Sequence, residues 1–185
     1  MARIDDDALE LEARRVLYDL ILGFHGLHMR EIQRKTGMSI ALVEYHLNSL
    51  EGAELISSVE DGGYKRYFAE PRDKDFPGFR ISHQDKRVIG VLRQRVPLQV
   101  ALLLLRTEWA SLKEISDSLG MAPSKLSFHL KKMLAVGIAV RTPRAEGKGY
   151  ALGDRAGILR LLVTFKPPQD MLEEFSELWD SIGEF

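Results

Sequence analysis

The sequence of 185 residues contains no cysteine. Disulfide bonds, thiolate metal sites and thiol nucleophiles are therefore excluded, and the absence fits a reducing compartment. No run of about 18 apolar residues occurs, so no membrane span is expected. The first residues, Met1 to Asp7, lack the basic start and apolar core of a signal peptide, so the expected location is the cytoplasm.

The chain also has no excess of charge of either sign, since 26 Lys and Arg face 27 Asp and Glu, a net charge of −1. Nucleic-acid-binding proteins usually have a basic surface, so this total by itself disfavours such a partner. Residues 1–83 carry 11 basic and 15 acidic side chains, residues 84–166 carry 15 and 6, and residues 167–185 carry none and 6. The neutral total is therefore a cancellation, and the basic middle segment suits a DNA partner.

Two segments align without gaps at a constant offset of 83 residues, the first from Met29 to Phe68 and the second from Leu112 to Ala151. A repeat of this kind indicates two copies of one small domain. The identical pairs are Glu31/Glu114, Ile32/Ile115, Gly37/Gly120, Met38/Met121, His46/His129, Leu47/Leu130, Lys65/Lys148 and Tyr67/Tyr150.

Each copy has the pattern of helices followed by a β-hairpin. In the first copy, apolar residues at helical spacing predict helices over 8–24, 29–35 and 40–50. Gly37 suits a turn with positive φ, and Ser39 suits a helix N-cap. Two β-rich runs, 55–59 and 64–68, flank an Asp-Gly-Gly turn and predict a hairpin.

The second copy repeats this plan. Helices are expected over 84–95, 98–106, 112–118 and 123–134, with Pro97 in a first helical turn, and strands over 139–142 and 150–152 around a turn over 144–149. The order of elements is that of a winged helix-turn-helix. The predicted fold class is thus mainly α with small β-hairpin wings (α+β), in two tandem winged helix-turn-helix domains plus C-terminal helices.

The predicted domains are residues 1–70 and 84–153, joined by a linker over 71–83 and followed by a helical tail over 154–185. In the tail, helices are expected over 155–165 and 169–183. The second is amphipathic, so it either docks on a second subunit, giving a homodimer, or folds back on its own chain.

The third helices carry a more specific signal. The segments Val43 to Leu50 (VEYHLNSL) and Leu126 to Met133 (LSFHLKKM) resemble the recognition-helix signature of arsenic-repressor-type (ArsR-like) regulators. The tandem arrangement is similar to archaeal transcriptional regulators with two such modules in one chain. The resemblance covers residues from roughly 8 to 152 and implies a sequence-specific regulator that binds double-stranded DNA, with the third helix in the major groove and the wing on the backbone.

In the second copy, Leu126, Leu130, Met133 and Leu134 are expected to form the buried stripe of the third helix, which leaves the opposite face to read DNA. Cations on the wing would neutralise phosphates. The candidate contacts on this helix are Ser124, Lys125, Ser127, Phe128, Lys131 and Lys132, and those on the wing are Arg141, Arg144 and Lys148.

The first copy offers a weaker set. Its third helix presents Glu44 and no cation, so this copy is expected either to bind DNA weakly or to serve as a scaffold or partner surface. Its candidate contacts are Ser39, Ala41, Tyr45 and Asn48 on the helix and Lys65 and Arg66 on the wing.

No catalytic constellation is present, so the protein is not expected to be an enzyme, and no metal or cofactor is predicted. His46 and His129 are interpreted as half-buried residues bonded to the preceding helix rather than as ligands of DNA or metal. The residues point to no particular small-molecule effector.

A different class of function remains open. Tandem winged helices also act as protein-interaction or scaffold modules in chromosome-condensation accessory proteins, transcription machinery and membrane-sorting complexes. The acidic first copy and acidic tail favour this alternative. A continuous basic face would favour DNA, and an exposed apolar patch would favour a protein partner.

Overall fold

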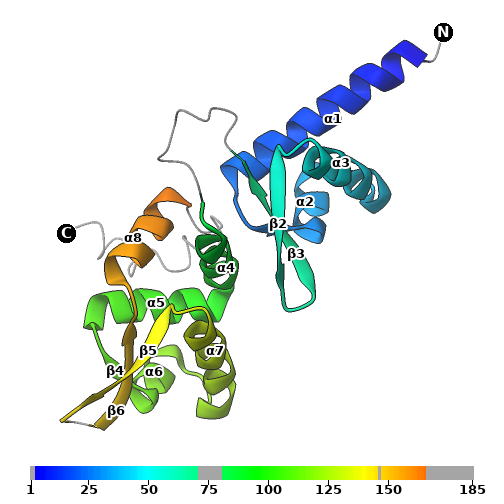
Figure 1. Cartoon of the computed structure of the whole chain (residues 1–185). Helices are drawn as coiled ribbons and strands as arrows, with labels where there is room; N and C mark the ends of the chain where they lie inside the picture. The colour runs from blue at the N-terminus through cyan, green and yellow to red at the C-terminus, as the bar shows by residue number, and fades with distance from the viewer. Residues whose placement is uncertain (1–2, 71–80, 146, 166–185) are drawn as a thin grey trace. The chain divides into compact units, whose positions relative to one another are not determined.

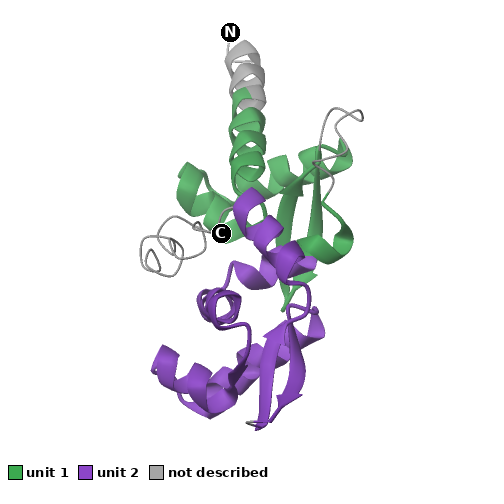
Figure 2. Ribbon diagram, turned by 90° about the vertical axis from the view of Figure 1, so that its left-hand side faces the viewer, with its two compact units in different colours: residues 1–86 green, residues 87–185 purple. Residues whose placement is uncertain are grey.

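The computed structural model describes residues 3–70, 81–145 and 147–165, with side chains described from residue 12 onward. The chain divides into two compact units, residues 1–86 and 87–185 (Figure 2). Most of the predicted linker over 71–83 and the predicted helix over 169–183 lie outside the described residues. The proposed domain boundaries, with 84–153 as the second domain, therefore stay predictions.

Unit 1 is a winged helix-turn-helix in which a long first helix precedes the helix-turn-helix and the hairpin (Figure 1). Its helices match the predicted order; α1 begins five residues before the predicted start and ends one residue before the predicted end, and α2 and α3 extend one and two residues beyond their predicted ends. The elements are α1 (Arg3–Gly23), β1 (Leu27–His28), α2 (Met29–Thr36), α3 (Ile40–Gly52), β2 (Ile56–Asp61) and β3 (Tyr64–Ala69).

Local interactions set the ends of α2 and α3. The backbone N–H of Glu31 donates to the His28 ring at 3.3 Å, and the Glu31 carboxylate accepts the His28 N–H at 3.0 Å, which forms a capping box. Gly37 ends α2 with φ of 70°, and the Ser39 hydroxyl then caps α3 by accepting the Leu42 N–H. The predicted glycine turn and serine cap are both confirmed.

The core of unit 1 lies where α1, α2 and α3 meet the sheet. Leu17 and Ile21 of α1 and Leu47 of α3 are fully buried. Each such side chain contributes about 1.5–3 kcal/mol through burial. The same cluster includes Leu27, Ile32, Val43, Leu50, Ile56 and Tyr67.

Unit 2 repeats this architecture and adds a final helix (Figure 1). Ser111 and Glu114 form the same capping box as His28 and Glu31, and Gly120 ends the following helix with φ of 57°. The boundary between the units falls within α4 (His83–Leu92). The elements that follow are α5 (Arg95–Thr107), β4 (Ala110–Ser111), α6 (Leu112–Leu119), α7 (Pro123–Ala135), β5 (Ala139–Arg144), β6 (Gly147–Leu152) and α8 (Arg155–Thr164).

Each unit contains a three-stranded antiparallel sheet whose central strand is the last one in sequence. The orders are β1-β3-β2 and β4-β6-β5. Leu27 pairs with Tyr67, and Ala110 pairs with Tyr150, so the register repeats at the offset seen in the sequence. The sequence analysis missed β1 and β4, because a strand of two residues has too few side chains to show alternation.

Two predicted boundaries in unit 2 are wrong. Helix α5 begins at Arg95, so the predicted break between residues 95 and 98 lies inside the helix. The wing turn is shorter than the predicted span of 144–149, since Arg144 already pairs with Gly147. The longer hairpin is accompanied by a contact distant in sequence, since the indole N–H of Trp109 donates to the Thr142 carbonyl at 2.8 Å.

In the part of the chain described here, no single helix meets the length and hydropathy needed to cross a membrane; α4 and α5 meet them only as a pair bent by 100°.

Gly149 of β6 is expected to be intolerant of a side chain. A Cβ atom there would lie 2.7 Å from the Ala110 carbonyl oxygen and closer still to the Trp109 ring. Gly149→Ala should destabilise unit 2 by about 1–3 kcal/mol, as overpacking does. Chemical denaturation checks this. The control is Gly52→Ala at the end of α3, where nothing lies within 4 Å and little change is expected; equal unfolding midpoints for both variants would contradict the packing described.

Candidate nucleic-acid interface

Helix α7 buries one face and exposes the other. Leu126, Leu130 and Met133 are buried, as predicted, whereas Leu134 is only half-buried. Pro123 opens the helix at a position where its missing N–H costs nothing. The exposed face contains the predicted residues Ser124, Lys125, Ser127, Phe128 and Lys131.

The exposed side chains of α7 include two cations and one aromatic ring. Among the described residues, Lys125 and Lys131 pair with no carboxylate. The Phe128 side chain is 65% exposed. The Ser127 hydroxyl donates to the Pro123 carbonyl at 2.8 Å. Lys132 is half-buried, and its ammonium lies 3.2 Å from Oε1 of Gln94, so it presents less of its charge than predicted.

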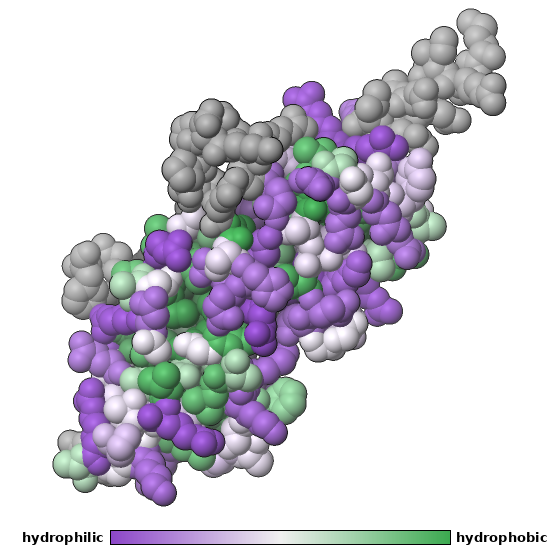
Figure 3. Space-filling view, in the orientation of Figure 1, coloured by the Kyte–Doolittle hydropathy of each residue, from purple (hydrophilic) through white to green (hydrophobic). Residues whose placement is uncertain are grey.

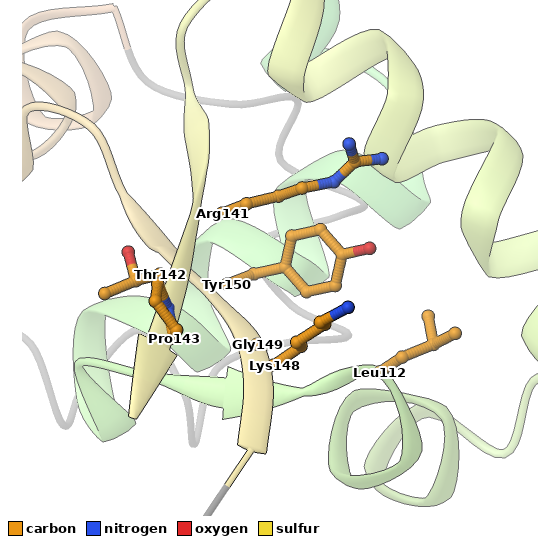
Figure 4. Close-up of a pocket in the computed structure, with 7 residues that line it drawn as sticks. All are labelled: Leu112, Arg141, Thr142, Pro143, Lys148, Gly149 and Tyr150. Atoms are coloured by element: carbon orange, nitrogen blue, oxygen red, sulfur yellow. The ribbon is translucent and has the colours of Figure 1, made fainter. Parts of the chain in front are cut away.

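The wing of unit 2 presents three exposed cations, Arg141, Arg144 and Lys148. Arg141 pairs with Tyr150, and Pro143 pairs with Lys148, so alternation places Arg141, Tyr150 and Lys148 on one face of the hairpin. Figure 4 shows these three side chains pointing to the same side. Arg144 lies on the opposite face, with its guanidinium 5.5 Å from the centre of the Trp109 ring.

The corresponding helix of unit 1 is different in character. Ser39, Ala41, Tyr45 and Asn48 are exposed on α3, and Tyr45 is 51% exposed. Ile40 and Leu42 are also exposed beside them. The sequence analysis missed Arg14 of α1, whose guanidinium lies 6.0 Å from the centre of the Tyr45 ring, because a contact between two helices leaves no local pattern.

The cations predicted on the first wing have partners within unit 1. Arg66 is buried, with Nε donating to Asp61 at 2.8 Å and Nη1 donating to the Gly26 carbonyl at 3.0 Å. Lys65 lies 3.6 Å from the Glu51 carboxylate. The burial of Arg66 argues against the predicted DNA contact, because its guanidinium is already bonded to Asp61 and to the Gly26 carbonyl.

The paired histidines lie beside the exposed aromatic residues. His46 is fully buried and His129 is half-buried, with ring centres 5.1 Å from Tyr45 and 5.4 Å from Phe128 respectively. Their predicted bonds to the preceding helix stay predictions. A search for three or more His, Asp or Glu side chains placed to hold a metal finds none within the described residues.

Comparison with known families identifies part of this architecture. Residues 99–140 match the sequence profile of the family described as "Bacterial regulatory protein, arsR family". The matched segment begins in α5, includes α6 and α7, and ends in β5. Unit 2 carries an ArsR-family helix-turn-helix. The ArsR-family helices are thus those with the exposed lysines, and the resemblance read from the recognition helix is confirmed.

The chain is similar to a longer archaeal protein and to solved structures. It is 26% identical over 137 residues to "Uncharacterized HTH-type transcriptional regulator MJ1398" of Methanocaldococcus jannaschii. The aligned segment is 73% of this chain but only about a third (32%) of that relative. Reduced HlyU from Vibrio cholerae aligns with 23% identity over 45% of this chain and 90% of its own, at a TM-score of 0.39. ScpB from Mycobacterium tuberculosis aligns with 17% identity over 82% and 96%, at a TM-score of 0.32.

The cations of the ArsR-family helix-turn-helix also affect its histidine. Burial lowers the pKa of His129, and the ammonium groups of Lys132 and Lys125 lower it further. The folded protein therefore binds this proton less readily than the unfolded chain. The resulting stability is present above the unfolded pKa of about 6.5 and is lost as the pH falls through the folded value.

We expect His129 to titrate below pH 6.5 in an NMR titration of its imidazole. Lys125→Gln should raise this pKa without restoring the ordinary value, because burial is the largest cause. Lys113→Gln, which removes an exposed cation of α6 that does not act on His129, is the matched control. Titration at or above 6.5 in the unmodified protein would show that the ring is not desolvated as described.

Proposed function

We propose that this protein is a sequence-specific double-stranded DNA-binding transcriptional regulator, with α7 in the major groove and the β5–β6 wing on the backbone. The observation that carries the proposal is the set of exposed cations on α7 and the wing of an ArsR-family helix-turn-helix, which have no carboxylate partners among the described residues. Unpaired cations bind phosphates by releasing counterions.

The shape of α7 suits the major groove. A groove about 12 Å wide admits one helix, which must bury one face in its own domain and present the other to the bases. Helix α7 does this over 13 residues. Ser124 and Ser127 are short polar side chains suited to base edges, Phe128 suits a thymine methyl group, and Lys125 and Lys131 suit phosphates or guanine.

The wing contributes position rather than sequence reading. Arg141, Arg144 and Lys148 are exposed along one hairpin, and contacts of such cations to phosphates fix the register of a protein on the duplex. On the face drawn in Figure 3, hydrophilic residues dominate the surface of unit 1, and hydrophilic and hydrophobic residues are both exposed on unit 2. No catalytic role is proposed. A homodimer would suit a two-fold DNA site, and it stays a prediction because residues 166–185 lie outside the described ones.

For unit 1 a second function is favoured by a specific observation. The side chains of Ile40, Leu42 and Tyr45 on α3 are 42%, 39% and 51% exposed, and the outward face of this helix contains Glu44 and no cation. Neighbouring exposed apolar side chains without a cation among them favour a protein contact. We propose that unit 1 acts mainly as a scaffold or protein-interaction module beside the DNA-binding unit.

Removal of two lysines from α7 tests the DNA proposal. Lys125→Ala combined with Lys131→Ala should weaken duplex binding and reduce the slope of log affinity against log salt concentration by about 1.8, because each phosphate contact contributes about 0.9. Fluorescence anisotropy at several salt concentrations measures both quantities, on a duplex obtained by selection from random sequences.

The control pair is Arg87→Ala with Arg106→Ala, which removes the same charge from exposed positions of unit 2 outside α7 and the wing. This pair should leave the slope nearly unchanged. If both pairs reduce the slope equally, α7 is not the contact surface and only the net charge of the unit matters.

Equivalent aromatic positions distinguish the roles of the two units. Phe128→Ala in α7 should weaken binding to the selected duplex, whereas Tyr45→Ala at the matching position of α3 should leave the affinity unchanged. Both side chains are more than half exposed, so neither change removes core packing. Equal losses of affinity in the two variants would assign both units to the DNA and reject the scaffold role of unit 1.

A further inference from the structure

A cleft lies between the wing of unit 2 and the start of α6. Its volume is about 480 Å³, which is within the range of ligand pockets. Leu112, Pro143 and the ring of Tyr150 line it with apolar surface, and Arg141 and Lys148 line it with charge (Figure 4). The cleft therefore combines apolar walls with two cations, which is the composition of a site for an anion attached to an apolar group.

The geometry of the hairpin brings the two cations to the same cleft. Arg141 lies opposite Tyr150, and Lys148 lies opposite Pro143. The two cations are therefore diagonal neighbours on one face of the hairpin. Diagonal neighbours on a sheet are about 7–8 Å apart at their backbones, so long side chains can converge on one group. Neither cation pairs with a carboxylate of the described chain.

In unit 1, a side chain of the same unit contacts the residues equivalent to the two cations. By the repeat, Ser58 corresponds to Arg141 and Lys65 to Lys148. The Glu51 carboxylate from the end of α3 lies between them. It accepts a hydrogen bond from the Ser58 hydroxyl at 2.5 Å and lies 3.6 Å from the Lys65 ammonium. An internal carboxylate thus contacts in unit 1 both residues that correspond to the two cations of unit 2.

Tyr67, the equivalent of Tyr150, shows the same difference between the two units. Tyr67 is 5% exposed, whereas Tyr150 is half-buried. Burial raises the pKa of Tyr67 to about 12, and the charge of Glu51 contributes to the rise, followed by Glu44 and Glu60. The Tyr67 phenol is therefore buried close enough to the Glu51 carboxylate to feel its charge, whereas the Tyr150 phenol lines an open cleft.

The residue that corresponds to Glu51 in unit 2 is Leu134, which carries no charge. Unit 2 therefore has two cations, Arg141 and Lys148, where unit 1 has only Lys65, and it lacks the internal carboxylate. We propose that the cleft of unit 2 binds an external oxyanion, a carboxylate or phosphate, between Arg141 and Lys148, with an apolar group attached to that anion packed on Leu112 and Tyr150.

Two sources can supply this chemistry, namely a free organic anion and a phosphate of the DNA backbone with its deoxyribose. The second source rests on the proposed function, because the same cations are proposed to contact DNA. The first does not, since binding of a free anion requires no duplex. Where both occur, they compete for the cleft.

Titration of the isotope-labelled full chain with phenyl phosphate, followed by NMR shifts of the Thr142 and Gly149 amides, tests the free anion. Saturable shifts are expected, with weaker binding of inorganic phosphate, which lacks the apolar group. Arg141→Ser, which installs the residue of unit 1, should weaken phenyl phosphate binding at least tenfold. Arg106→Ser is the control at an exposed cation outside the cleft and should not.

The sharpest variant is Leu134→Glu, which places the internal carboxylate of unit 1 into unit 2 and keeps both cations. It should abolish phenyl phosphate binding. Ala135→Glu adds the same charge one residue later, at an exposed position, and should retain it. Thermal unfolding of each variant confirms that it is folded. The same four variants are then measured with the selected duplex by anisotropy.

Loss of phenyl phosphate binding in Leu134→Glu but not in Ala135→Glu supports the site and a free anion as a ligand, even if no duplex binds. Absence of phenyl phosphate binding, together with duplex binding at least tenfold weaker in Leu134→Glu than in Ala135→Glu, supports the site with the DNA backbone as the source. If phenyl phosphate does not bind and the two variants bind duplex equally, the proposal is overturned, whether or not unit 2 binds DNA elsewhere.

Discussion

The pairing of the central strand with the short strand before the helix-turn-helix is the interaction on which each unit depends. In unit 1, β3 pairs with β1, and in unit 2, β6 pairs with β4. Without this pairing the wing would be a two-stranded hairpin, which is marginally stable in water. With it, the wing is hydrogen-bonded to the residues that immediately precede α2 or α6.

The register of that pairing also decides which way each wing side chain points. Neighbouring residues of a strand alternate between the faces of the sheet, so a one-residue shift would exchange the two sets. Arg66 and Gly149 occupy equivalent positions, on the face of each sheet opposite to that of Tyr67 and Tyr150. There, Arg66 bonds to Asp61 and the Gly26 carbonyl, whereas Gly149 leaves space for Trp109. The same strand position thus holds the Arg66–Asp61 ion pair in unit 1 and makes room for the Trp109 ring in unit 2.

Much of the fold could be predicted because its signals are local. The glycine turns, the Ser39 cap and the buried faces of α3 and α7 follow from residues within a few positions of one another, and the repeat doubled the signal of the glycine turns and of the buried faces. The interactions that the sequence did not reveal depend on which side chains the folded chain brings together, and no periodic pattern marks them. The Trp109 indole donates to the Thr142 carbonyl, Arg66 donates to the Gly26 carbonyl, and Glu51 contacts Ser58 and Lys65.

Contacts of this kind also explain why the candidate site was predicted only in part. The cations of α7 are exposed because the stripe of Leu126 and Leu130 faces the core, and that stripe can be read from the sequence. Whether a cation is available for a ligand depends instead on its neighbours in space. Lys65 and Lys148 are identical residues at equivalent positions, yet only Lys65 has a carboxylate beside it within the described chain.

The difference at positions 51 and 134 has a physical consequence for how such a fold diverges. A carboxylate on the same chain acts at a high effective concentration, in the millimolar range or above for short connections, whereas a free ligand must be present at a comparable concentration to displace it. In the proposed site, Glu51 competes with external anions in unit 1, whereas Leu134 adds no charge at the equivalent position of unit 2. Two substitutions, Glu51 to Leu134 at the helix end and Ser58 to Arg141 on the wing, would then separate the proposed scaffold unit from the proposed binding unit, while the strand register stays the same.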